Sequence, residues 1–264
     1  MPLAATGSLL GAAARQRRAV AAFDVVTLDH VQAVVSGAEA ADAPVILQIG
    51  ESAVQYHDGL LLPLARAAAE AARAAAVPVA LHLHRVRRTA LLAQAAHCGF
   101  SSVMYDAAHL PYADHVAHTR DAVSWAHQQG LWAEAEFGRG ARTDPAAARA
   151  FVAATGVDAL AVDVWPDRQL LARLRAAVGV PLVLRDSAGL ADEDLGRAAA
   201  AGIAKVAIGP ALDLAMTAAV RARLAADTAA APRDWLGDGR RAMATAVTRL
   251  LTALPPRLPA TAAP

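Results

Sequence analysis

The chain of 264 residues has a single cysteine, Cys98, and a single lysine, Lys205. One cysteine excludes an intrachain disulfide, so we expect a protein of the reducing cytoplasm. Positive charge is therefore carried by arginines, and these are scattered along the sequence rather than clustered. The formal net charge of +1 gives no electrostatic reason to expect nucleic acid or an anionic membrane as a partner.

Long uncharged apolar runs are also missing. Residues Met1–Gln16 have no basic start followed by an apolar stretch, so no signal peptide is predicted. Glu70 and Arg73 interrupt the alanine-rich segment Ala67–Val79, which leaves it short of the roughly 20 residues of a membrane span. Hydrophobic residues make up 56% of the chain and charged residues 19%, which excludes wholesale disorder. We expect one soluble domain over residues 1–264, with frayed ends near 1–10 and 254–264.

Short β-branched and apolar runs alternate with longer stretches of helical period, a pattern typical of repeated βα units. Eight strands are predicted, at Val20–Phe23, Val45–Gln48, Val79–Leu83, Ser102–Tyr105, Leu131–Glu136, Ala159–Val162, Leu182–Leu184 and Val206–Ile208. One further helical stretch, Arg240–Leu251, follows them. The pattern predicts an α/β protein with a single (β/α)8 barrel and an extra C-terminal helix.

Polar or small residues stand at the ends of the predicted strands. They are Asp24, His84, Asp106, Glu136, Asp163, Arg185 and Gly209. In a (β/α)8 barrel the carboxyl ends of all strands meet at one face, where the βα loops present the functional groups. We therefore expect the functional site there, although any βα loop also needs polar residues after a buried strand.

A series of phrases recurs, in the same order and with similar spacing, in a known enzyme family. The phrases are Ala22–Val25, Pro44–Gln48, Pro78–Leu83, Gly99–Asp106, Glu134–Gly138, Thr143–Pro145, Thr155–Val162, Pro181–Leu184 and Pro232–Leu236. From about residue 10 to 253 the chain resembles the class II, zinc-type, fructose-bisphosphate and tagatose-bisphosphate aldolases. The resemblance implies a (β/α)8 barrel and carbon–carbon lyase (aldehyde-lyase) chemistry of carbohydrate metabolism.

The family binds one zinc ion through three histidines, and this chain departs from the pattern at each ligand. Arg85 and Arg185 stand where the ligands after the third and seventh strands are expected, and the segment 163–167 after the sixth strand has no histidine. Of the family's metal-site set we count Asp106 and Glu136 as the surviving positions. The resemblance, with these departures, predicts no metal and no other cofactor.

The two arginines suggest a substitute for the lost ion. A fixed guanidinium can replace a metal cation against the same carboxylates, so we expect Arg85 and Arg185 to pair with Asp106 and Glu136. Two outcomes stay open. In a changed enzyme, His84, Asp106 and Glu136 are the candidate catalytic residues, His84 as general acid/base because its unperturbed pKa is near 6.5. In a pseudoenzyme, the barrel binds a small anion or a partner subunit without chemistry.

The ligand is expected to be a small anionic or sugar-like molecule. The candidate binding residues are Arg85, Arg185, Ser187, Gly189 and Gly209. A bisphosphate is disfavoured, because Pro210 has no N–H to donate and Asp186 is negative where a phosphate would lie. By resemblance a homodimer or homotetramer is expected.

Other interpretations compete at several of these residues. His84 and Arg85 could be a solvated pair after a strand, and Asp106 could cap a loop. His82 is expected to be a core histidine. Lys205 is expected at the start of the eighth strand, remote from the site and structural. Trp165 could close over the pocket or pack on a neighbouring subunit.

Overall fold

The computed structural model describes residues 3–137, 144–163, 167–185 and 190–254. Eight parallel strands form a closed barrel in chain order, with β8 hydrogen-bonded back to β1. The strands are β1 (Val20–Asp24), β2 (Val45–Gly50), β3 (Val79–Val86), β4 (Ser102–Tyr105), β5 (Trp132–Glu136), β6 (Ala159–Val162), β7 (Leu182–Leu184) and β8 (Ile203–Ile208). The predicted (β/α)8 barrel is confirmed.

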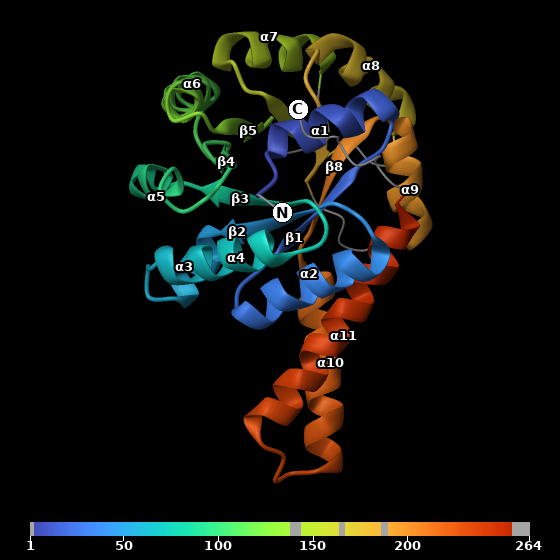
Figure 1. Cartoon of the computed structure of the whole chain (residues 1–264). Coiled ribbons are helices and arrows are strands. Elements are labelled where there is room, and N and C mark those ends of the chain that lie inside the picture. Colours follow the sequence, from blue (N-terminus) through green and yellow to red (C-terminus); the bar gives the residue numbers. More distant parts are fainter. Residues whose placement is uncertain (1–2, 138–143, 164–166, 186–189, 255–264) are drawn as a thin grey trace.

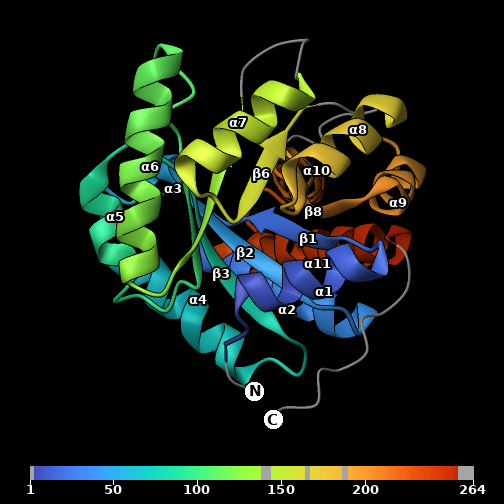
Figure 2. The ribbon, with the colours of Figure 1, turned by 90° about the horizontal axis from the view of Figure 1, so that it is seen from above.

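Helices surround this barrel and join its strands (Figures 1 and 2). They are α1 (Thr6–Gln16), α2 (Leu28–Ala41), α3 (Glu51–Tyr56), α4 (Leu62–Ala74), α5 (Thr89–Ala95), α6 (Tyr112–Gln128), α7 (Pro145–Thr155), α8 (Arg168–Val178), α9 (Asp192–Ala201), α10 (Pro210–Ala226) and α11 (Pro232–Ala253). Asp144 and Asp167 accept backbone hydrogen bonds at the starts of α7 and α8, as N-cap carboxylates do. None of the described helices is long and apolar enough to cross a membrane.

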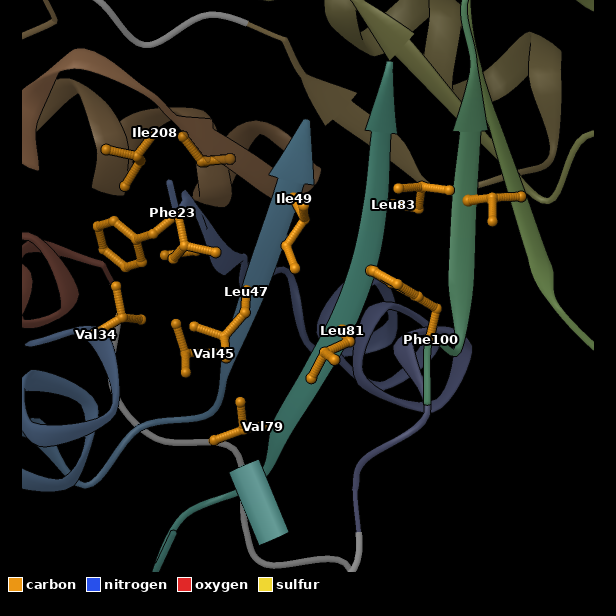
Figure 3. Packing of buried hydrophobic residues seen from close by; sticks show 14 of the residues in the cluster. Phe23, Val34, Val45, Leu47, Ile49, Val79, Leu81, Leu83, Phe100 and Ile208 are labelled. Atoms are coloured by element: carbon orange, nitrogen blue, oxygen red, sulfur yellow. The ribbon is translucent and has the colours of Figure 1, made fainter. Parts of the chain in front are cut away.

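The main core lies between the strands and the surrounding helices. Alternate residues of a strand point to opposite faces, and the outward set Phe23, Leu47, Leu81 and Leu83 packs in this layer (Figure 3). All four side chains are fully buried. The inward-facing side chains are apolar near the amino-terminal end of the barrel. Toward the carboxyl end they are polar and charged, and these form the site described below.

Helix α1 closes the amino-terminal end of the barrel. Its Leu10 and Ala13 pack against Val20, Ile46 and Met104 inside the barrel, and the backbone of Ala4 donates to the carbonyl of Val79 (2.9 Å). Residues 3–10, expected within a frayed end, therefore belong to the folded barrel. Apolar side chains therefore fill this end of the barrel.

Several strands are longer than the sequence analysis predicted, and β3 and β8 are extended most. β3 continues to Val86, and β8 begins at Ile203 rather than Val206. Lys205 is consequently the third residue of β8 and is fully buried. Lys205 was expected at the strand start, remote from the site. This position is wrong, because β8 already includes Ile203 and Ala204 before it.

The C-terminal helix is confirmed and is longer than predicted, since α11 begins at Pro232. Helices α10 and α11 run side by side and extend away from the barrel (Figure 1). α11 also packs along α2, where Gly37 lies directly against Val247 and the backbone of Ala244. A side chain at position 37 would collide with both, so glycine permits this close helix approach.

Candidate active site

A cavity of about 610 Å³ opens at the carboxyl end of the barrel. Its described wall comes from the ends of β1, β2, β3 and β8, the residues that follow β4 and β7, and the first turns of α3 and α10. The volume is within the range of small-molecule sites, about 300–1,000 Å³. The functional face predicted from the strand ends is therefore the face that is hollowed.

Glu136, at the end of β5, binds two arginines. Its Oε1 accepts from Arg185 (2.7 Å) and its Oε2 lies 3.5 Å from Arg85. The Glu136 side chain is 1% exposed, so its charge needs such partners. Arg185 also reaches Asp163 (3.0 Å). The Glu136 half of the predicted arginine pairing is present.

Asp106 has a different partner from the one expected. Arg87 donates to Asp106 Oδ2 through Nε (3.0 Å) and one Nη (2.9 Å). This contact, together with Arg85 nearby, holds the pKa of Asp106 below its usual value even though burial alone would raise it. The expected Arg85–Asp106 pair is wrong, because the extra residues of β3 carry Arg87 to the mouth. The sequence signal was available: Arg87 stands two residues after Arg85.

Arg85 owes its direction to an irregular backbone. Its φ is +50°, in the left-handed region, and the pairing of β3 with β4 shifts register between Leu83 and Val86. A β-bulge of this kind re-aims a side chain next to a site. The Arg85 side chain is 37% exposed, and among the described residues its ion pair is a long one, to Glu136 (3.5 Å). Among the arginines on the described wall, Arg85 has the longest ion pair with a carboxylate.

Asp24, at the end of β1, is a carboxyl of the pocket wall with a raised pKa. Burial raises its pKa to about 6, although Gln48, which donates to Oδ1 (3.0 Å), opposes the rise. Gly209 lies beside it: a Cβ at position 209 would come within 3.1 Å of Asp24 Oδ2. Asp24 was noticed only as one strand-end residue, because its pKa depends on surroundings that the sequence does not give.

A second polar layer lies directly beneath the pocket. His82 and His84 of β3, Glu134 of β5 and Lys205 of β8 meet there, and Lys205 Nζ donates to Glu134 Oε2 (2.7 Å). Burial, with the charge of Lys205, holds the pKa of both histidines well below the usual value. His84 is therefore a neutral imidazole, and the unperturbed pKa on which its predicted acid/base role depended does not apply.

The predicted binding residues are only partly placed. Arg85, Arg185 and Gly209 line the pocket. Ser187 and Gly189 lie outside the described residues, as do Asp186 and Trp165.

These features define a (β/α)8-barrel protein with a charged small-molecule pocket at the carboxyl ends of its strands. Residues 4–255 match the model of the family described as fructose-bisphosphate aldolase class-II, and the chain belongs to that family.

Its relatives are aldolases. The chain is 31% identical to the "Probable fructose-bisphosphate aldolase" of Bacillus subtilis, over 92% of this chain and 94% of that protein. It is 30% identical to the "Fructose-bisphosphate aldolase" of Giardia intestinalis, over 92% and 90%. The crystal structure of the YdjI aldolase of Escherichia coli superposes with a TM-score of 0.87 at 28% identity, covering 95% and 96% of the two chains.

The family is zinc-dependent, so the donors of this chain must be tested against a zinc ion. At the mouth they do not fit: positions 85 and 185 carry guanidinium groups, which have no lone pair to give, and Glu136 is already bound by both. The layer beneath is different. His82, His84 and Glu134 bring one potential ligand atom each to within 4.8 Å of one another. The expectation that metal ligands are absent is therefore not supported.

Proposed function

We propose that this chain is a carbon–carbon lyase of the aldolase type that acts on a small hydroxycarbonyl compound with at most one strongly anionic group. Asp24 is the group that moves the proton, and Arg85 is the group that holds the anion. The observation that carries the proposal is the position of Asp24, a half-buried carboxyl with a raised pKa in a pocket wall that also carries Arg85.

Aldol cleavage needs a base for the hydroxyl proton and returns a proton to the enediolate carbon. A carboxyl whose pKa is about 6 can perform both transfers near neutral pH, since general acid–base catalysis is best when pKa and working pH are close. Asp106 and Glu136 are less suited, because arginines already bind both carboxylates. They are better explained as fixing the arginines of the wall.

Charge on the wall limits the substrate. The described lining has three arginines, each in contact with a carboxylate. It also has four carboxyl groups, on Asp24, Glu51, Asp106 and Asp213. Such a wall has no excess of positive charge for two phosphates. A singly charged or neutral sugar derivative is favoured over a bisphosphate.

The competing function is a pseudoenzyme that binds the same class of molecule without turnover. It is favoured by the arginine-bound state of Asp106 and Glu136, which leaves few free groups at the mouth. Zinc, in this family, polarises the ketose carbonyl, and the described residues of the mouth offer no ligand set for that ion.

Turnover separates the two functions. Retro-aldol cleavage should be followed by NMR with fructose bisphosphate, tagatose bisphosphate, ketose monophosphates and unphosphorylated ketoses, with zinc and with a chelator. We expect cleavage of a monophosphorylated or unphosphorylated ketose and its loss in Asp24→Asn. Binding of ketoses without cleavage of any of them would favour the pseudoenzyme. The control Asp213→Asn changes a carboxyl that lines the same pocket but bonds to His30 on α2, and it should keep most of the activity.

A further inference from the structure

The polar layer beneath the pocket contains unsatisfied groups that the proposed chemistry does not use. Three side chains of this layer each have a buried polar atom without a hydrogen-bond partner among the described residues: Nε2 of His82, Nδ1 of His84 and Oε1 of Glu134. Leaving a buried polar atom unsatisfied costs about 1–3 kcal/mol. Three such atoms in one place call for an occupant.

The three residues converge from two strands. His82 and His84 alternate on β3, so both rings point inward, with centroids 5.4 Å apart and planes tilted by 49°. Their ligand atoms and that of Glu134, from β5, all lie within 4.8 Å of one another. All three residues are at most 8% exposed. Two imidazoles and one carboxylate are a donor set that zinc accepts, with a remaining position for water or a ligand.

Hydrogen bonds fix the ring of His82 in the form that a metal requires. Ser102 Oγ donates its only proton to Thr6 Oγ1 (2.8 Å), so it can only accept from His82 Nδ1 (2.7 Å). The proton of His82 is therefore on Nδ1, and Nε2 carries a lone pair into the cluster. A ligand histidine with its second nitrogen bonded to an outer partner is the usual arrangement at metal sites.

We propose that His82, His84 and Glu134 form a binding site for one divalent ion of the zinc class, one layer below the mouth position that Arg85 and Arg185 fill. His84 both lines the pocket and belongs to the cluster, so the ion enters through the pocket floor. Lys205 holds the other oxygen of Glu134, which orients Oε1 toward the two rings. Its ammonium also repels the ion, so the site binds more weakly than one without that charge. The site does not depend on the proposed lyase activity.

Metal content of the purified protein tests the site without an activity assay. After loading with Zn²⁺ and dialysis, we expect one zinc per chain by mass spectrometry, and visible absorption of a low-coordinate complex when Co²⁺ replaces it. His84→Gln should lose both signals. His115→Gln is the matched control, since His115 is also a buried histidine with an unpartnered Nε2 in the described structure, and it should keep them.

Lys205→Met provides a second variant that reports on the same site. Removing the ammonium frees Glu134 and should tighten zinc binding by about tenfold or more, a difference of about 1.4 kcal/mol or more. The metal should also raise the midpoint of thermal unfolding of this variant more than that of the parent. The proposal would be overturned if neither the parent nor Lys205→Met bound metal. It would also be overturned if a folded His84→Gln bound as much metal as the parent. Absence of aldol turnover would not affect it.

Discussion

The buried ion pair between Lys205 and Glu134 makes the strongest stability prediction. The Nζ–Oε2 distance is 2.7 Å, and the two side chains are 0% and 1% exposed. Removing one partner of such a pair leaves the other charged and unpaired in the interior, which costs about 3–5 kcal/mol. Lys205→Met should therefore destabilise the metal-free protein by about that amount. At about 2–4 °C per kcal/mol for a chain of this size, the unfolding midpoint should fall by roughly 10 °C.

Urea and thermal unfolding in the presence of a chelator measure this effect, because bound metal would partly mask it. The double variant Lys205→Met/Glu134→Leu should recover most of the loss, since a buried pair can be replaced by apolar groups at little cost. Arg197→Met breaks an exposed pair with Glu193 on α9 and should change stability by less than about 0.5 kcal/mol. If Lys205→Met were as stable as Arg197→Met, the buried pair as described here would be refuted.

Three further predictions concern the pocket. The folded-state pKa of Asp24, about 6, lies above its unfolded value. Ionising Asp24 therefore costs the folded protein stability, and this loss is absent below about pH 4 and develops as the pH rises to about 6. The stability of the parent relative to Asp24→Asn should fall by at most about 3 kcal/mol between pH 4 and 7 in urea titrations, and a constant difference would contradict the raised pKa. Because Arg85 has φ of +50°, Arg85→Gly should be about 1 kcal/mol more stable than Arg85→Ala by the same assay, and equal stability would contradict the left-handed backbone. Gly209→Ala places a methyl group 3.1 Å from Asp24 Oδ2 and should lower kcat/KM in the retro-aldol assay while the unfolding midpoint changes little; unchanged kcat/KM would remove Asp24 from the reaction.

The barrel itself could be predicted from the sequence because its signals are local. Eight apolar runs at regular spacing, with Pro44, Pro78 and Pro181 before three of them, leave few alternatives to a closed parallel barrel. The errors occurred where a strand continues through residues that do not suit it. β3 passes through a left-handed Arg85 and ends at Val86, and β8 includes Lys205.

The partners at the site were harder to predict than the residues. The strand ends gave Asp24, His84, Asp106, Glu136 and Arg185 as a group, and all of them lie at or just beneath the mouth. Which cation meets which carboxylate depends on a bulge that moves Arg87 rather than Arg85 onto Asp106.

The inner layer was missed for a similar reason. Because Lys205 was expected at a strand start, nothing in the sequence suggested pairing it with Glu134. His82 was expected to be a core histidine, and the sequence does not show which residues surround it. Their convergence comes from the register of strands β3, β5 and β8 around the closed barrel, which requires the three-dimensional structure.

The central claim is that Asp24 moves a proton on a hydroxycarbonyl compound in this pocket. Exchange of solvent deuterium into the α-carbon of dihydroxyacetone and of its phosphate, followed by proton NMR, tests that step without a complete aldol reaction. The account predicts exchange catalysed by the parent protein and by Asp213→Asn, and none above background with Asp24→Asn. Undiminished exchange with Asp24→Asn, or no exchange by the parent with either compound, would contradict it.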